Sequence, residues 1–186
     1  MQNLPNILTT FRIAMVPALY LAFFVDGAIG DWLCVVIFAL AGATDFLDGW
    51  VARRYEMQSG FGRMLDPIAD KLLVITCLML LVQAHIIQDI HFLAALIIMC
   101  REILVSGLRE YLMELRVSLP VSTLAKFKTT LQMVALGFLL SDEAGKTVIA
   151  QAHLVGLTLL WLAAALTLLT GYDYLRKGLK HAKWSE

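Results

Sequence analysis

Six long apolar stretches follow one another along this chain of 186 residues, and they constrain its fold more than any other feature. They cover approximately residues 7–25, 32–55, 65–84, 91–114, 124–140 and 147–173. A helix crosses the core of a bilayer with roughly 20 consecutive apolar residues, and each stretch comes close to that length. The mean hydropathy of +0.76 is too high for an ordinary soluble domain. We therefore predict an all-α integral membrane protein of six transmembrane helices, forming a single domain over residues 1–186.

The basic residues predict how these helices are oriented. When six spans are drawn, the Lys and Arg residues fall at one set of helix ends, and only Lys146 falls at the other. The loops at the opposite end carry acidic residues instead, namely Asp26, Asp31, Asp89, Asp142 and Glu143. Loops on the cytoplasmic side of a membrane are enriched in Lys and Arg. We therefore expect the basic end, and both termini with it, to face the cytoplasm.

Two pairs of aspartates lie at this basic end, beside apolar stretches: Asp45 with Asp48, and Asp66 with Asp70. Their spacings of three and four residues place each pair on one side of its own helix. Ser59, Gly60 and Gly62 break the chain between the pairs, so that the two helices can face each other. Four nearby carboxylates repel one another strongly unless cations neutralise them or some protons are retained. The pattern therefore favours a site for divalent cations.

The residue types around this cluster narrow its chemistry. Hard oxygen ligands suit Mg²⁺, Mn²⁺ or Ca²⁺, and the absence of nearby His or Cys argues against a zinc site. Gly49, Ala52 and Gly62 are small enough to let helices approach closely or to leave room for a flat ligand. Arg53 adds a fixed positive charge that can bind phosphate oxygens bidentately. Together these residues indicate a pocket for a nucleotide diphosphate.

The spacing D-x₂-D-G-x₂-A-R-x₈-G-x₃-D-x₃-D, which begins at Asp45 and ends at Asp70, resembles the signature of the CDP-alcohol phosphatidyltransferases. All eight signature positions match, and the resemblance extends over nearly the whole chain. It implies six transmembrane helices in a homodimer, located in the bacterial cytoplasmic (inner) membrane. It also implies an active site that holds two divalent ions, Mg²⁺ or Mn²⁺, and opens toward the cytoplasm.

The resemblance also implies roles for the aspartates. Asp45, Asp48 and Asp66 would bind two metal ions that clamp the diphosphate of CDP-diacylglycerol. Asp70 would be the general base, and would also contact a metal. The acceptor hydroxyl would lose its proton to Asp70 and attack the phosphate that carries the diacylglycerol, while CMP leaves.

The same resemblance implies how the nucleotide is held. Gly49, Ala52 and Gly62 would accommodate the cytidine, and Arg53 would bind its phosphates. CDP-diacylglycerol and membrane lipids are therefore the expected partners, together with a second copy of the chain and a small acceptor. No nucleic acid partner is expected.

The acceptor is indicated by basic residues of the fourth and fifth apolar stretches: Arg101, Arg109, Lys126 and Lys128. They supply enough positive charge to hold a doubly charged phosphate monoester. Residues 5–12 and 101–110 resemble members of the family that use glycerol 3-phosphate and produce phosphatidylglycerophosphate. Such cations can also satisfy topology or bind anionic lipid head groups without taking part in catalysis. Phosphatidylglycerol, as in cardiolipin synthases, inositol phosphate and serine are the alternative acceptors.

Other interpretations of these residues are open. The aspartates could form a solvated cap paired with neighbouring arginines, or line the path of a divalent-cation transporter. A transporter predicts acidic residues distributed toward the far side of the membrane, whereas here they gather at one end. Asn6, Thr9 and Arg12 could line the nucleotide site, but helix capping and anchoring at the interface explain them equally well.

Overall fold

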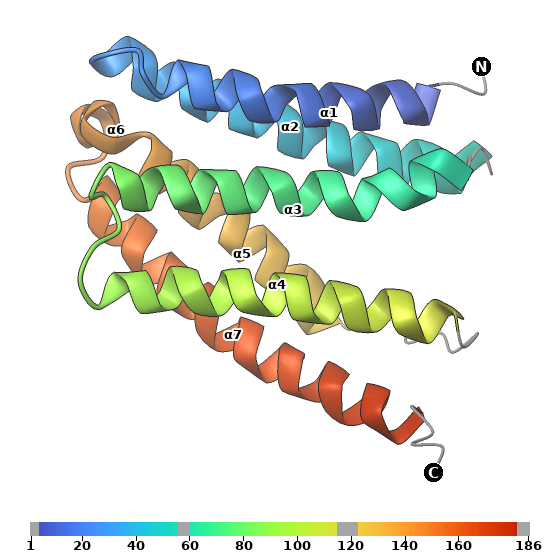
Figure 1. Ribbon diagram of the computed structural model, residues 1–186. Coiled ribbons are helices and arrows are strands. Elements are labelled where there is room, and N and C mark those ends of the chain that lie inside the picture. Colours follow the sequence, from blue (N-terminus) through green and yellow to red (C-terminus); the bar gives the residue numbers. More distant parts are fainter. Residues whose placement is uncertain (1–3, 56–59, 115–122, 182–186) are drawn as a thin grey trace.

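The computed structural model contains only helices over the residues that it describes (Figure 1). It describes the backbone of residues 4–55, 60–114 and 123–181, and within these ranges it excludes the side chains of 4–6, 45–55, 60–64, 66, 114, 177 and 179–181. In this part of the chain there are seven helices: α1 (Leu4–Ala22), α2 (Ala28–Tyr55), α3 (Gly60–Gln83), α4 (His91–Glu114), α5 (Thr123–Leu140), α6 (Asp142–Val148) and α7 (Ala152–His181).

The six long helices coincide with the six apolar stretches, but the last boundary differs from the prediction. The sixth stretch was expected to begin near residue 147, whereas a separate short helix, α6, occupies that region and α7 begins at Ala152. Ile149 interrupts the helix, with extended backbone angles of φ −131° and ψ 105°. The side chain of Asp31 on α2 accepts a hydrogen bond from the backbone N–H of Ala144 at 3.0 Å, which ties α6 to α2.

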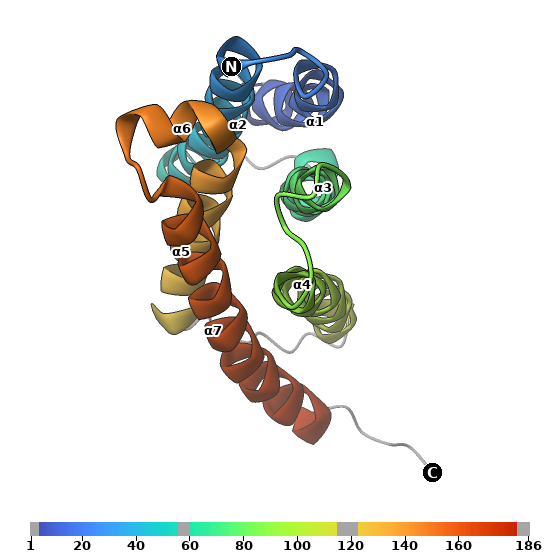
Figure 2. The same cartoon turned by 90° about the vertical axis from the view of Figure 1, so that its left-hand side faces the viewer.

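The helices pack in two groups that share one apolar core. α1 packs against both α2 and α3, while α7 packs against both α4 and α5 (Figure 2). The core is continuous across the groups and contains large aliphatic and aromatic side chains, among them Leu19, Phe38, Leu78, Ile98, Leu136 and Leu160. Buried Ala and Cys residues lie between them, and their small side chains let the helices approach one another.

Two helical segments are long and apolar enough to cross a membrane, judged by length and composition over the described residues: His91–Met113 and Ala152–Arg176. Shorter apolar helical stretches cover Ile7–Ala22 and Ala28–Thr44. Many large apolar side chains are exposed on the outside of the bundle, including Leu21, Ile29, Leu104, Leu154 and Leu169. Exposed apolar surface of this extent favours a lipid environment over water.

Both ends of the helical chain lie at the same end of the bundle. The first turn of α1 and the last turn of α7 lie toward the right-hand side of Figure 1, as do the carboxyl ends of α2 and α4 and the amino end of α3. α6, which carries Lys146, lies at the opposite end. The arrangement therefore brings together those halves of the long helices that carry the predicted site.

Candidate active site

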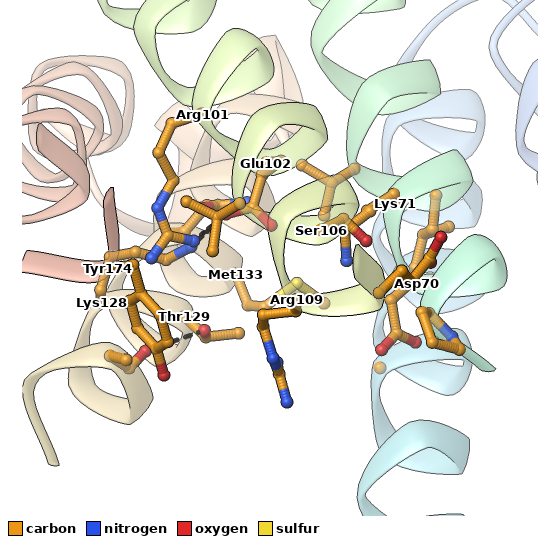
Figure 3. Close-up of a pocket in the computed structure, with 18 of the residues that line it drawn as sticks. Asp70, Lys71, Arg101, Glu102, Ser106, Arg109, Lys128, Thr129, Met133 and Tyr174 are labelled. Atoms are coloured by element: carbon orange, nitrogen blue, oxygen red, sulfur yellow. Dashed lines mark hydrogen bonds and ion pairs between the residues drawn. The ribbon is translucent and has the colours of Figure 1, made fainter. Parts of the chain in front are cut away.

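One cavity of about 320 Å³ opens among the long helices, in the half of the bundle where the chain's basic residues gather. Its walls come from α1, α2, α3, α4, α5 and α7. Six of the residues that line it carry the chemistry considered below: Arg12, Asp70, Arg101, Glu102, Arg109 and Lys128. Asp70 lies on one side of the cavity, and Arg101 and Lys128 lie on the other (Figure 3).

Asp70, the predicted general base, is held by an arginine from the first helix. The Nη1 atom of Arg12 donates a hydrogen bond to Oδ1 of Asp70 at 2.8 Å. Arg12 is almost completely buried, with 1% of its side chain exposed, whereas 43% of the Asp70 side chain is exposed. A charge-assisted bond from a buried and therefore immobile guanidinium fixes the orientation of the carboxylate. Asp70 thus presents a fixed, accessible oxygen acceptor to the cavity.

The opposite side of the cavity contains two cations gathered around one carboxylate. Lys128 on α5 and Arg101 on α4 both donate to the same oxygen, Oε1 of Glu102, and the Arg101 bond is 3.2 Å long. Lys128 is buried, with 2% of the residue exposed. Two positive charges around a single partly buried carboxylate leave an excess of positive charge at this wall. An anion entering the cavity is therefore attracted to it.

α7 fixes the Arg101 side chain from the other side. The Thr170 hydroxyl donates to the backbone carbonyl of Leu166 at 2.8 Å, and this leaves its oxygen free to accept a bond of 3.2 Å from Nη2 of Arg101. Gly171 follows directly and has no side chain to keep Arg101 away. A Cβ atom at this position would lie 3.0 Å from Cγ of Arg101. Thr170 therefore holds Arg101 by a hydrogen bond, and Gly171 leaves room for its side chain.

The predicted acceptor-phosphate residues differ in their relation to the cavity. Arg101, Arg109 and Lys128 line it, and the Arg109 side chain extends between the two sides in Figure 3. Lys126 is exposed and is not one of the lining residues. Positions 126 and 128 are two apart on α5, so their side chains point in different directions around the helix.

The cavity wall contains a buried donor, Nε of Arg101, and a buried acceptor, Oε1 of Gln132, that have no hydrogen-bond partner among the described residues. Such atoms are rare in native structures, because leaving a buried donor or acceptor unpaired is unfavourable. Among the residues that line this cavity there are therefore one buried donor and one buried acceptor that no described residue satisfies.

The remaining predicted site residues lie where the side chains are not described. Asp45, Asp48, Gly49, Ala52 and Arg53 belong to the last turns of α2, and Gly62 and Asp66 belong to the first turns of α3. Within the described part of the chain, no three His, Cys, Asp or Glu side chains form a metal site. Of the four aspartates, only the side chain of Asp70 belongs to this described part. The metal and nucleotide ligands thus stay predictions, although an accessible carboxylate such as Asp70 has the donor chemistry that a hard divalent cation requires.

Comparison with known proteins identifies the family. The sequence profile of the CDP-alcohol phosphatidyltransferases matches residues 2–169. The chain belongs to the CDP-alcohol phosphatidyltransferase family. This CDP-alcohol phosphatidyltransferase is 47% identical over 175 residues to a protein of Rickettsia bellii named CDP-diacylglycerol–glycerol-3-phosphate 3-phosphatidyltransferase, and the match covers 94% of each chain. Proteins of the same name from Cereibacter sphaeroides and Haemophilus influenzae are 36% and 39% identical, over 97% and 94% of this chain and 97% and 92% of theirs.

Membership of the CDP-alcohol phosphatidyltransferases confirms the resemblance inferred from the aspartate signature and leaves the cation-transporter interpretation without support. The sequence did not reveal the parts played by Glu102, Gln132 and Thr170. Gln132 was detectable in principle, because an amide inside an otherwise apolar membrane stretch is costly unless it has a partner. The pairing of Arg12 with Asp70 joins residues 58 positions apart, and no local pattern signals such a contact.

Proposed function

We propose that this protein transfers the phosphatidyl group from CDP-diacylglycerol to sn-glycerol 3-phosphate, giving phosphatidylglycerophosphate and CMP in phospholipid biosynthesis. It would then act as a phosphatidylglycerophosphate synthase, as the names of its relatives state for them. The observation that carries the proposal is the cavity itself. One cavity has an oriented carboxylate on one side, and buried Lys128 and partly buried Arg101 on the other.

The cation side fits the phosphate of the acceptor. Arg101 and Lys128, gathered by Glu102, and Arg109 can together neutralise a dianionic monoester. An acceptor without a phosphate, such as serine, does not require this much positive charge in the cavity wall. Phosphatidylglycerol would have to bring its acyl chains to the same opening.

The carboxylate side fits the reacting hydroxyl of the acceptor. With the acceptor phosphate on the cation side, the far hydroxyl points toward Asp70. Asp70 takes the proton of this hydroxyl, and Arg12 keeps the carboxylate in place during the transfer. The deprotonated oxygen attacks the phosphorus that carries the diacylglycerol, and the bond from that phosphorus to the CMP oxygen breaks.

A divalent cation, Mg²⁺ or Mn²⁺, fits the predicted donor set of Asp45, Asp48, Asp66 and Asp70. When bound, two such ions supply charge neutralisation on the diphosphate. Gly49, Ala52, Arg53 and Gly62 would hold the cytidine and its phosphates. These roles belong to the proposal and rest on the sequence signature.

The proposal includes an arrangement in the bacterial cytoplasmic membrane. Six helices would span the bilayer as one domain, with both termini and the cavity on the cytoplasmic side, and two copies would associate as a homodimer. The apolar exterior of the bundle and the basic half of its long helices support this orientation.

The proposal is tested by measuring CMP release from CDP-diacylglycerol by the detergent-purified protein with Mg²⁺. Glycerol 3-phosphate, inositol phosphate, phosphatidylglycerol and serine are offered in separate reactions. We expect release only with glycerol 3-phosphate. Release with a different acceptor would contradict the proposed substrate, and no release with any acceptor or metal would contradict the proposed activity.

A further inference from the structure

Gln132 is a buried amide in the wall of the cavity. It lies on α5, four residues after Lys128 and hence on the same face of the helix, and only 2% of the residue is exposed. Its amide oxygen is buried and receives no hydrogen bond from any described residue. The unfavourable burial of such an oxygen would be relieved by a donor that arrives with a ligand.

The chemistry of this ligand follows from Nε of Arg101 and Oε1 of Gln132, for which the described residues provide no partner. Nε of Arg101 is a donor, and a phosphate oxygen can accept from it. The Gln132 oxygen is an acceptor, and a fully ionised phosphate has no hydrogen to offer it. A hydroxyl group does. The wall therefore fits a ligand that carries a hydroxyl close to its phosphate, as a phosphorylated polyol does.

We propose that Gln132 is a specificity-determining residue that accepts a hydrogen bond from the non-reacting hydroxyl of the acceptor. The inference rests on the proposed function and refines it. Because Gln132 follows Lys128 on one helix face, the hydroxyl that it recognises is the one next to the phosphate, on C2 of glycerol 3-phosphate. The hydroxyl farther from the phosphate stays available to Asp70.

The test compares glycerol 3-phosphate with propane-1,3-diol monophosphate, which lacks only the C2 hydroxyl. For the wild-type protein we expect kcat/KM to be about tenfold or more lower with the analogue, the effect of one lost hydrogen bond to a buried partner. In Gln132→Met, which keeps the length of the side chain, kcat/KM for glycerol 3-phosphate should fall by about tenfold and the two acceptors should differ by less than about threefold.

A stability measurement separates this role from a structural one. The substrate-free Gln132→Met protein should unfold in detergent at the same temperature as wild type or higher, because the substitution removes an unpartnered buried atom. Thr167→Val is the matched control, since the Thr167 hydroxyl is likewise buried without a partner among the described residues but does not line the cavity. It should raise or maintain the unfolding temperature and leave both kcat/KM values unchanged.

Three results would overturn the inference: equal use of the two acceptors by the wild type, undiminished discrimination by Gln132→Met, or loss of folding in both Gln132→Met and Gln132→Leu. Loss of folding counts against it because an amide oxygen without a partner among the described residues contributes nothing that an apolar side chain cannot replace. A wild-type protein that releases no CMP with glycerol 3-phosphate would instead contradict the proposed function.

Discussion

Replacing Gly171 by alanine tests whether the position of Arg101 controls the binding of the acceptor. The new methyl carbon would lie 3.0 Å from Cγ of Arg101, whereas non-bonded carbons pack at about 3.5–4.0 Å. The Arg101 side chain must therefore move by about 0.5 Å or more. Its bonds to Glu102 and Thr170 are both 3.2 Å long, and a shift of that size takes them past about 3.5 Å, where little hydrogen bonding remains.

The expected consequence is a selective loss of acceptor affinity. A misplacement of about 1 Å in a substrate-positioning group costs up to about a hundredfold in rate. For about half that displacement we expect the KM for glycerol 3-phosphate to rise about tenfold, equivalent to about 1.4 kcal/mol. The KM for CDP-diacylglycerol should stay within about twofold of wild type, because Arg101 lies on the acceptor side of the cavity. Steady-state CMP release in detergent micelles measures both constants.

Gly178→Ala provides the matched control on the same helix. A methyl group there would lie 2.9 Å from Cδ2 of Leu108 on α4. The contact between α7 and α4 is as close as in Gly171→Ala, but the residue contacted is a leucine. We expect it to leave the acceptor KM near the wild-type value. If both variants raise this KM equally, or if both lose thermal stability and activity together, then separation of the helices explains the effect and the reasoning about Arg101 is refuted.

Three further predictions follow from single side chains. Asp70→Asn, whose amide oxygen can still accept the hydrogen bond from Arg12, should abolish turnover while the protein stays folded, and near-normal CMP release would exclude Asp70 as the base. Arg109→Ala should raise the KM for glycerol 3-phosphate about tenfold or more, and Lys126→Ala by much less, because only Arg109 lines the cavity; equal effects would contradict this geometry. Burial, and then the negative charge of Asp31, raise the pKa of Asp142 above its usual value of 3.8. Asp142 therefore stabilises the fold only while protonated, and this contribution is lost as the pH rises through the raised pKa. At pH 7, Asp142→Asn should therefore unfold at a higher temperature than wild type. Below about pH 4 the two proteins should unfold at the same temperature.

The positions of the long helices were predictable because each depends on a local property, an apolar stretch bounded by polar or turn-forming residues. α6 was not predictable in the same way. A helix of seven residues has little stability of its own, and this one is tied to α2 through the contact between Asp31 and Ala144. Such contacts between distant parts of the chain leave no trace in the local pattern.

The site was predictable to the extent that its residues belong to one short motif, the aspartate signature that ends at Asp70. Asp70 and the cations of α4 were identified from spacing and charge, whereas the carboxylate that gathers these cations was not. The sequence did not single out Glu102, and its contact with Lys128 depends on how α4 and α5 both pack against α7. Thr170 and Gln132 carry no charge that could mark them in the sequence. The bond from Arg101 to Thr170 and the unpaired oxygen of Gln132 among the described residues both depend on how the helices pack.

The most direct test of the central claim follows the phosphate of the acceptor into lipid. The purified protein is incubated with CDP-diacylglycerol, Mg²⁺ and glycerol 3-phosphate labelled with ³²P, and the organic extract is counted and resolved. The account predicts label in phosphatidylglycerophosphate, one CMP released for each labelled lipid, and loss of both products with a chelator. Label that stays in the aqueous phase while CMP is released would contradict it, because the phosphatidyl group would then be going to water or to another acceptor.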